Sequence, residues 1–345
     1  MRRTRVGIIN VTGYAGVELA RLLYQHPGVE LASVTGRSAA GQKLDMVFPH
    51  LVSQGLTIEA GLGEVDFAFS ALPHKESAPE IVPLLEAGIK VVDISADFRL
   101  KDAKAYPDWY GFTHPAPQLL SQAVYGLTEL YRTQVVSAQL VANPGCYPTG
   151  AILALAPAVK EGLVKPDIII DSKSGVSGAG RSLSLQTHFS EVNEDVSAYA
   201  LAGHRHLPEI IQELKFLGFK SPSITFVPHL IPMTRGILTT AYAPLVPGKI
   251  APGEKGEKEL RQLYLDFYKD EPFVRIAASP PHTKHTWGNN LCLIYPTIDR
   301  RTDRLIVISC LDNLVKGAAG QAIQNMNLML GLPETTGLEA LAVYP

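Results

Sequence analysis

Short apolar runs alternate with segments of helical periodicity over roughly the first half of the chain, and this alternation restricts the fold more than any other feature of the sequence. The runs are apolar from end to end, which is typical of parallel strands buried on both faces of a sheet. Between them, residues 17–26 and 78–88 repeat apolar side chains at helical spacing. We therefore expect an α/β domain with a parallel sheet covered on both faces. The expected strands are residues 5–11, 30–36, 64–72, 90–98 and 140–143, with a helix over 151–162 after the last of them.

The pattern changes beyond residue 165, where β-rich segments are separated by turns. We expect a second, α+β domain here, with a largely antiparallel sheet and one helix over residues 257–269. The expected strands are residues 167–174, 223–232, 237–246, 290–298 and 304–311. Residues 251–259 resemble a solvated loop, and residues 312–330 are again helical, with small residues on one face that suit a return to the first domain.

The composition excludes several classes of protein. A length of 345 residues favours two domains, and a net charge of -2 gives no basic field that would attract nucleic acid or a membrane surface. No apolar run approaches the length of a spanning helix. Cys146, Cys292 and Cys310 are too few and too far apart for a disulfide framework, and no Cys or His spacing indicates a metal site. We therefore expect a cytoplasmic protein without a metal, nucleic-acid or membrane partner.

A glycine-rich turn connects the first expected strand to the first expected helix. Gly7, Gly13 and Gly16 surround this turn, and glycines there let the backbone approach a pyrophosphate at the helix N-terminus. The first glycine of a G-x-x-G-x-x-G pattern is replaced by Asn10, which tolerates the left-handed backbone better than most residues. The turn predicts a dinucleotide site, although a strand–helix turn without a ligand remains the alternative.

The end of the second expected strand indicates which dinucleotide binds. An acidic residue at this place would suit the ribose 2′-hydroxyl of NAD, but the chain reads Thr35-Gly36-Arg37-Ser38. Arginine with a neighbouring hydroxyl suits a 2′-phosphate, so we favour NADPH. The alternative is that Arg37 is an ordinary solvated side chain.

Cys146 is the candidate nucleophile. It lies in NPGCYPTG, where the chain bends before an apolar helix that we expect to begin near Thr149. A thiol at the positive end of a helix dipole ionises more readily, and the thiolate attacks an acyl carbon to give a thioester. The alternative is an inert thiol in a tight turn. Cys292 and Cys310 lie inside apolar runs and are expected to be core residues.

A histidine pair supplies the candidate proton-transfer group. His204 and His206 lie in a polar, glycine-flanked loop before a helix, and in an extended segment they would share a face opposite Arg205. We choose His206 as the base because it is nearer the helix, and His204 or Arg205 would orient the substrate. His188 is a weaker candidate.

Two further segments are suited to anions. The Gly/Ser-rich residues 174–181 offer backbone N–H groups together with Arg181, and Arg99 follows the strand-like residues 90–98, where open α/β sheets bind ligands. The alternative for each arginine is that it is an ordinary surface charge without a ligand. The full set of candidate substrate ligands is Arg99, Asn143, Ser177, Gly178, Arg181 and His204.

Six segments together resemble one enzyme family almost from end to end. They are TGYAG (12–16), SADFRL (95–100), ANPGCYPTG (142–150), SGVSGAGR (174–181), GHRHLPEI (203–210) and DNLVKGAAGQA (312–322). This set resembles the N-acetyl-γ-glutamyl-phosphate reductase family, which is related more distantly to aspartate-semialdehyde and glyceraldehyde-3-phosphate dehydrogenases. The cysteine and histidine segments are its most specific motifs.

The resemblance implies an organisation of the chain and a set of cofactor ligands. Residues 1–145 would form an NADP-binding Rossmann domain completed by a C-terminal helix over residues 312–345, and residues 146–311 would form a catalytic and oligomerisation domain. By the same resemblance Cys146 is the nucleophile and His206 the base. The cofactor ligands would be Asn10, Thr12, Gly13, Tyr14, Ala15, Gly16, Gly36, Arg37, Ser38 and Asn313.

The resemblance implies NADPH-dependent reductive dephosphorylation of an acyl phosphate to a semialdehyde through a cysteine thioester. The substrate is N-acetyl-γ-glutamyl phosphate in arginine biosynthesis, or 2-aminoadipate 6-phosphate or glutamyl phosphate attached to an acidic amino-group carrier protein. Asn10-Val11 departs from the usual acetylglutamyl pattern and favours the carrier-linked aminoadipate branch of lysine biosynthesis. We expect a homodimer or homotetramer.

Three alternatives remain open from the sequence. An aspartate-semialdehyde-type dehydrogenase would share the architecture and act on a different acyl phosphate. A Cys/His acyltransferase or hydrolase would not use the glycine-rich turn. A non-catalytic dinucleotide sensor would keep that turn without needing Cys146.

Overall fold

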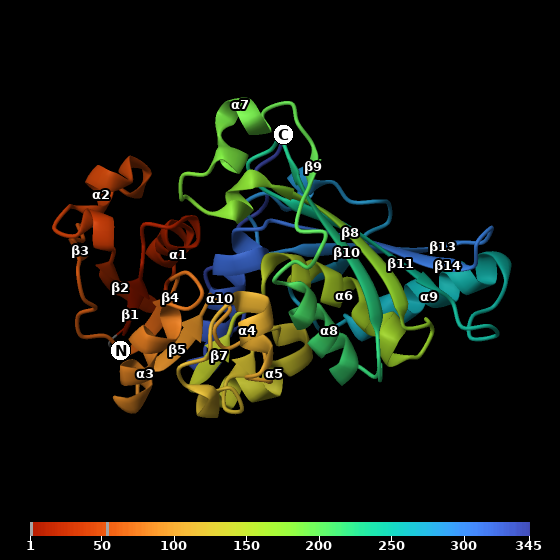
Figure 1. Cartoon of the computed structure of the whole chain (residues 1–345), viewed down its shortest axis with the longest axis horizontal. Helices are drawn as coiled ribbons and strands as arrows, with labels where there is room; N and C mark the ends of the chain where they lie inside the picture. Colours follow the sequence, from red (N-terminus) through yellow and green to blue (C-terminus); the bar gives the residue numbers. More distant parts are fainter. Residues whose placement is uncertain (1–2, 53–54) are drawn as a thin grey trace. The chain divides into compact units, whose positions relative to one another are not determined.

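The computed structural model describes residues 3–52 and 55–345 and divides the chain into two compact units. The first unit comprises Met1–Gly145 together with Ala318–Ala340. The second comprises Cys146–Gly317 together with Leu341–Pro345. Each unit contains a mixed set of helices and one sheet, labelled in Figure 1.

The sheet of the first unit has the strand order β3-β2-β1-β4-β5-β7-β6, and each neighbouring pair is parallel. The strands are β1 (Thr4–Ile9), β2 (Val29–Thr35), β3 (Ile58–Glu59), β4 (Phe67–Ser70), β5 (Lys90–Asp93), β6 (Val124–Tyr125) and β7 (Leu140–Ala142). The order runs outward in opposite directions from β1 and from β4, so the topological switch point of this doubly wound sheet lies between these two strands. The predicted Rossmann-like α/β unit is confirmed.

Helices cover this parallel sheet, as the uninterrupted apolar strands require. All four residues of β4 and the last four of β1 are buried, which matches a sheet covered on both faces. The helices are α1 (Tyr14–Tyr24), α2 (Leu44–Val47), α3 (Ser77–Glu86), α4 (Ala105–Tyr110), α5 (Thr128–Ser137) and α10 (Gly320–Met329). Short 3-10 turns lie at Arg37–Ala39, Pro49–Leu51 and Pro117–Leu119.

The C-terminal helix is shorter than the predicted segment 312–345. A π-helical turn, Val315–Ala319, precedes α10, which ends at Met329, and Leu341–Pro345 group with the second unit. Within the first unit α10 packs against α1, α5 and β5. Its buried amides hold it there: Gln321 Nε2 donates to the Gly126 carbonyl at 2.9 Å, and Asn325 Nδ2 donates to the same carbonyl at 2.8 Å. The small residues of this helix permit that close packing, whereas Gly331 ends the helical pattern.

The sheet of the second unit has the order β12-β13-β14-β11-β8-β10-β9. Only β12–β13 and β8–β10 are parallel among the ladders of this sheet in the described residues, so the predicted, largely antiparallel sheet is confirmed. The strands are β8 (Asp167–Gly175), β9 (Ser197–Ala198), β10 (Ser223–Ile231), β11 (Ile237–Pro244), β12 (Val274–Ile276), β13 (Cys292–Asp299) and β14 (Arg304–Leu311). Burial alternates residue by residue along β13, which indicates one covered face and one partly exposed face.

The covered face packs on α6, which Figure 1 shows lying along the long strands between α8 and α9. The helices of this unit are α6 (Cys146–Lys160), α7 (Phe189–Val192), α8 (Leu207–Phe216) and α9 (Gly253–Phe267). Short 3-10 turns lie at Val176–Ala179, Leu185–Thr187 and Thr283–Thr286. Side chains also anchor α6 to the sheet and to α9, because Ser309 Oγ donates to the Gly150 carbonyl at 2.9 Å and Tyr264 Oη to the Ala154 carbonyl at 2.8 Å.

The prediction of a solvated loop over residues 251–259 is wrong from Gly253 onward, where α9 begins. Pro252 in an extended conformation precedes the helix, and the charged residues pair along one turn, as in Lys255 with Glu259. The charged residues and glycines of this segment therefore led to the prediction of a loop, although they form an exposed face of α9.

No helix among residues 3–52 and 55–345 is both long enough and apolar enough to cross a membrane.

Candidate active site

The glycine-rich turn of the first unit is held at the carboxyl ends of three parallel strands. Asn10 has φ +66°, so asparagine takes the left-handed conformation at this place. Its backbone N–H donates to Thr35 Oγ1 at 3.1 Å, at the end of β2, and its Nδ2 donates to the Ala71 carbonyl at 2.9 Å, just after β4. Asn10 therefore connects β1, β2 and β4 at the switch point.

Gly16 in this turn and Gly36 after β2 leave no room for a side chain. A Cβ at Gly16 would lie 2.4 Å from the Asn10 carbonyl oxygen and 2.7 Å from Val11 Cα. A Cβ at Gly36 would lie 2.8 Å from Thr12 Cγ2. The close approach of β1 to the N-terminus of α1 is the arrangement that a dinucleotide pyrophosphate requires, so these residues fit that group. Tyr14 and Ala15 form the first turn of α1.

Arg37 and Ser38 are exposed in the 3-10 turn after β2. Arg37 Nη1 lies 2.6 Å from Glu76 Oε2, and its Nη2 lies 3.9 Å from Glu80 Oε1. The side chain is 69 % exposed, so a 2′-phosphate at this place would compete with a solvated ion pair and not with a buried one. Its role in cofactor binding stays a prediction.

Arg99 and Asn143 are buried inside the first unit. Arg99 Nε donates to the Asn143 carbonyl at 2.8 Å, and Arg99 Nη2 donates to the Ile94 carbonyl at 2.7 Å. Asn143 Nδ2 donates to the Ala318 carbonyl at 3.0 Å and Asn143 Oδ1 accepts from Asn325 at 3.1 Å. Both side chains brace the ends of β5 and β7, and their roles as substrate ligands stay predictions.

Cys146 is the first residue of α6, three residues earlier than the predicted start at Thr149. The helix begins early because Pro148 lies in its first turn, where a missing N–H costs no intrahelical hydrogen bond. Cys146 is partly exposed, whereas Cys292 and Cys310 are buried in β13 and β14. A Cβ at Gly317 would lie 2.8 Å from Cys146 Cβ, so a glycine of the π-helical turn lies directly against the candidate nucleophile.

Tyr147, the neighbour of Cys146, packs edge-on against both candidate histidines. Its ring centroid lies 5.5 Å from that of His204 and 5.9 Å from that of His206, and the two histidine rings are 4.8 Å apart. Phe226 on β10 closes this group at 5.5 Å from Tyr147. The second unit therefore packs both candidate histidines against Tyr147, the covalent neighbour of Cys146, and this aromatic residue was not among the predicted site residues.

His204 and His206 share a side for a reason other than the predicted extended segment. They lie in the turn before α8, and His206 is the N-cap residue with helical φ and ψ. His204 Nδ1 accepts the backbone N–H of His206 at 3.1 Å, which closes the turn and brings the rings together. Burial, with a smaller contribution from Arg205, lowers the pKa of His204 to about 4.

Residues 174–181 are less open to an anion than predicted. The N–H groups of Gly175, Val176 and Ser177 donate to the carbonyls of the 233–236 segment, which uses three of the expected donors. Gly178 and Arg181 are exposed, and His188 is exposed at the N-cap of α7.

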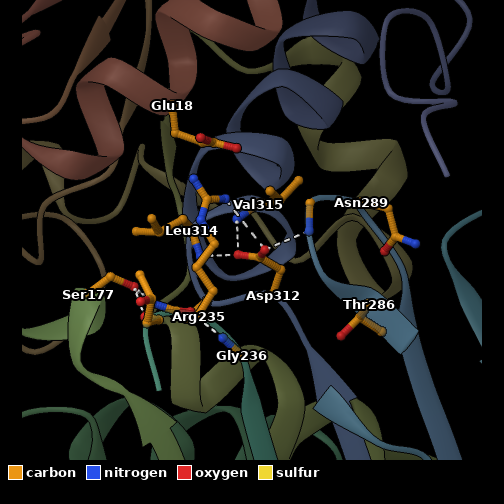
Figure 2. Close-up of polar contacts among 12 residues, drawn as sticks. Glu18, Ser177, Arg235, Gly236, Thr286, Asn289, Asp312, Leu314 and Val315 are labelled. Carbon is orange, nitrogen blue, oxygen red and sulfur yellow. Dashed lines mark hydrogen bonds and ion pairs between the residues drawn. The ribbon is translucent and has the colours of Figure 1, made fainter. Parts of the chain in front are cut away.

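Asn313 ties this loop to the end of β14, and Figure 2 shows the polar contacts of the neighbouring Asp312. Asn313 Nδ2 donates to Ser177 Oγ at 2.8 Å, and Asn313 Oδ1 accepts the Gly236 N–H at 2.7 Å. The buried Asp312 carboxylate accepts the N–H groups of Leu314, Val315 and Gly288 and lies 3.5 Å from Arg235 Nη1. Asn313, which was predicted to contact the cofactor, therefore joins two segments of the second unit by hydrogen bonds, and its contact with the cofactor stays a prediction. Arg235 and Asp312 carry no sequence signal beyond the turn-like PMTRG and the resemblance segment 312–322.

Two family descriptions match the chain and together cover most of it. Residues 5–138 match the semialdehyde dehydrogenase NAD binding domain, and residues 146–313 match the semialdehyde dehydrogenase dimerisation domain.

Curated relatives match over the full length. An N-acetyl-gamma-glutamyl-phosphate reductase of Dehalococcoides mccartyi is 59% identical over 100% of both chains. One of Pelotomaculum thermopropionicum is 52% identical over 99% of both chains.

Solved structures of lower identity share the fold. Aspartate semialdehyde dehydrogenase II of Vibrio cholerae superposes with a TM-score of 0.70 at 15% identity, covering 96% of this chain and 99% of the other. The aspartate semialdehyde dehydrogenase of Candida albicans, solved with NADP, gives a TM-score of 0.65 at 15% identity, covering 95% and 99% of the two chains.

Proposed function

Because the chain belongs to the N-acetyl-γ-glutamyl-phosphate reductase family and is an NADP-dependent oxidoreductase, we propose that it converts N-acetyl-γ-glutamyl phosphate to the corresponding semialdehyde in arginine biosynthesis. The observation that carries the proposal is the ring of Tyr147, which is covalently next to Cys146 and packs on His204 and His206. This contact supports the proposal, because it joins the covalent neighbour of the candidate nucleophile to the candidate base within the second unit.

Cys146 forms and then releases the covalent intermediate. Its thiolate, favoured at the N-terminal end of α6, attacks the carbonyl carbon of the acyl phosphate. The carbon–oxygen bond to phosphate breaks, phosphate leaves with the electron pair, and a thioester remains on Cys146. The hydride that reduces this thioester comes from NADPH when the cofactor is bound. The carbon–sulfur bond then breaks, which releases the semialdehyde and restores the thiolate.

His206 moves the protons of this sequence. It accepts the thiol proton of Cys146 before the attack and exchanges a proton with the oxygen of the reduced intermediate. His204 is unsuited to that role, because its Nδ1 accepts the His206 N–H and its pKa lies near 4. This supports His206 over His204 as the base.

Trapping the intermediate tests the proposal. Mixing the full-length protein with N-acetyl-γ-glutamyl phosphate without NADPH should give a hydroxylamine-labile acyl adduct on Cys146, detected by mass spectrometry, with release of phosphate. Cys146→Ala should lose turnover by at least about 10³-fold and keep NADPH binding. Cys310→Ala is the matched control and should keep both turnover and the acyl adduct on Cys146. Burial raises the pKa of the Cys310 thiol to about 12, so Cys310 should stay unacylated in the unmodified protein. Retained turnover in Cys146→Ala would exclude covalent catalysis.

Comparing substrates separates the alternatives. The curated relatives favour the free acetylated substrate. The reason for preferring the carrier-linked aminoadipate branch no longer holds, because Asn10 at φ +66° adopts the conformation that the usual glycine would. Measuring kcat/KM with free acetylglutamyl phosphate, aspartyl phosphate and carrier-linked aminoadipyl phosphate should rank the first highest. Preference for either of the others would reassign the substrate, and acyl transfer without NADPH oxidation would indicate a hydrolase or acyltransferase.

Assembly and location belong to the same proposal. The match of residues 146–313 to a dimerisation domain supports a homo-oligomer built through the second unit. The cysteines Cys146, Cys292 and Cys310 form no disulfide with one another, which suits the reducing cytoplasm.

A further inference from the structure

We propose that Tyr199 and His204 are positioning residues for His206: the Tyr199 hydroxyl accepts the His204 Nε2–H, which leaves His204 Nδ1 as the acceptor that fixes the turn presenting His206. This inference rests on the proposed function, in which His206 is the proton-transfer group. Neither residue needs to touch the substrate in this role, so His204 moves from the predicted substrate ligands to the support of the base.

The hydrogen bonds determine the tautomer of His204. A backbone N–H only donates, so the nitrogen facing it must be without a proton; this nitrogen is His204 Nδ1, 3.1 Å from the His206 nitrogen. A neutral imidazole carries its proton on the other nitrogen, which is Nε2. Nε2 lies 3.4 Å from Tyr199 Oη, so His204 donates to the tyrosine.

The same argument identifies the donor and the acceptor in the hydrogen bonds that continue from Tyr199. Tyr199 Oη, having accepted from His204, donates to Tyr147 Oη at 3.1 Å. Tyr147 Oη in turn donates to the His229 carbonyl at 3.3 Å, which can only accept. This series of hydrogen bonds therefore runs from the His206 turn through His204, Tyr199 and Tyr147 to β10. Each of the two tyrosine hydroxyls accepts one hydrogen bond and donates one.

Packing holds these hydrogen-bonded side chains in place. The rings of Tyr199 and His204 lie 5.5 Å apart at 74°, and Phe226 lies 5.4 Å from His204 at 86°. The Tyr199 N–H donates to the Pro228 carbonyl at 3.1 Å, which ties the residue after β9 to β10. Rotation of His204 would break two hydrogen bonds and several ring contacts together.

The charge state of His204 agrees with this role. Burial, with a smaller contribution from Arg205, places its pKa near 4, so the ring is neutral at neutral pH. Protonation would put a second N–H on Nδ1, directly facing the His206 N–H, and would open the turn. A neutral His204 with a fixed tautomer supports the turn, and only His206 is left to transfer protons.

A matched pair of substitutions separates the two nitrogens of His204. His204→Asn keeps an acceptor oxygen near the Nδ1 position, which bonds an N–H two residues on, as in an Asx turn. His204→Gln instead places its amide near the Nε2 position and leaves the His206 N–H without that acceptor. We expect kcat of His204→Asn to fall by about tenfold, as in Tyr199→Phe, because both variants lose the hydrogen bond between His204 and Tyr199, and kcat of His204→Gln to fall by at least about a hundredfold. Equal losses, or the reverse order, would overturn the proposal.

Tyr199→Phe removes the distal hydrogen bond. We expect kcat to fall by about tenfold while KM for the acyl phosphate and Kd for NADPH change by less than about twofold. The acidic limb of the kcat profile, which reports the base, should shift relative to wild type. The control is Tyr264→Phe, which removes a buried hydroxyl bonded to the Ala154 carbonyl in the same unit and should lower the melting temperature without changing kcat or the pH profile. A Tyr199→Phe variant with kcat and profile like wild type would contradict the role.

A measurement on the unmodified full chain keeps the test independent of activity. Long-range proton–nitrogen NMR correlations, assigned through His204→Asn, should show His204 with its proton on Nε2 at neutral pH. A proton on Nδ1, or a charged ring, would overturn the inference even if the reductase activity were present. Conversely, the inference would be upheld by an Nε2–H tautomer together with the expected order of the variants, measured with the acyl substrate that the protein turns over. This outcome would uphold the inference even if acetylglutamyl phosphate proved to be the wrong substrate.

Discussion

Tyr147 connects two residues, Cys146 and His206, that lie sixty positions apart in the chain. The sequence predicted both as candidates because a cysteine at a proline-glycine bend and a histidine pair before a helix are unusual patterns. Their roles in catalysis stay predictions. Tyr147 and Tyr199 were missed, since a tyrosine in a loop has no signature that separates a hydrogen-bonded support from an ordinary aromatic residue. Only the fold shows that their hydroxyls meet at 3.1 Å.

At the residue scale, Gly317 is expected to be intolerant of a side chain. Gly317→Ala places a methyl group 2.8 Å from Cys146 Cβ and 3.3 Å from the Asp312 carbonyl, so Cys146 must move. A displacement of this kind at a nucleophile should lower kcat by about 10²-fold while NADPH affinity is retained, measured by steady-state kinetics and cofactor titration. Gly61→Ala, where the added Cβ meets nothing within 4 Å, is the control. Unchanged kcat in Gly317→Ala would show that Cys146 tolerates the shift.

Elements differed from expectation mainly at their ends. Periodicity predicted the strands and long helices of both units, but α6 begins three residues early at Cys146 and α9 begins inside the expected loop. Prolines at the helix starts and ion pairs along one helical turn favour these ends, and neither changes the hydrophobic pattern. The glycine-rich turn was predicted as an imperfect motif, whereas the structure shows Asn10 joining β1 to β2 and β4.

At the element scale, Asn10 is expected to serve the turn in two separable ways. Asn10→Gly keeps access to φ +66° but loses the Nδ2 bond to Ala71, and Asn10→Ala loses the bond and adds left-handed strain. The backbone term favours Gly over Ala by about 1 kcal/mol, so Kd for NADPH should rise more, by up to about fivefold, in Asn10→Ala than in Asn10→Gly. Isothermal titration of both variants checks this order. Equal affinities would mean that the strain is not felt at the cofactor site.

The whole chain forms two units whose boundary the hydrophobic pattern did not fix. The C-terminal segment Ala318–Ala340 returns to the first unit, where α10 is held by buried amides of Gln321 and Asn325. The sequence suggested a close-packing helix over residues 312–330, but it could not show which carbonyl groups its buried amide N–H groups would reach. Such pairing depends on carbonyl groups of residues nearly two hundred positions away.

At the scale of the whole molecule, stability is expected to respond to a buried carboxylate. Burial, followed by repulsion from Asp97, raises the pKa of Asp93 from 3.8 to about 6, against hydrogen bonds from Ser77 and Ser95. Because the folded value lies above the unfolded one, this carboxyl contributes most below pH 3.8, and its contribution is lost as pH rises through about 6. The amount lost is on the order of 3 kcal/mol.

Three histidines change the stability of the fold with pH in the opposite direction. Burial lowers the pKa of His26, His114 and His204, so each weakens the fold as pH falls below its ordinary value of 6.5. Urea unfolding of wild type and Asp93→Asn between about pH 4 and 8 isolates the carboxyl term. The stability of Asp93→Asn relative to wild type should increase with pH up to about 7 and then level off. Parallel curves would mean that Asp93 titrates normally in the folded protein.

The amino-acid sequence alone determined the two kinds of sheet, the glycine-rich turn and the candidate cysteine and histidine, because hydrophobic period and turn chemistry are local properties of consecutive residues. Only the tertiary structure decided which side chains meet: Gly317 against Cys146, Asn10 across three strands, and the chain from His204 through Tyr199 to Tyr147. The physical reason is that a hydrogen bond or a ring contact depends on positions set by remote packing, and the residue types involved are compatible with many arrangements until that packing selects one.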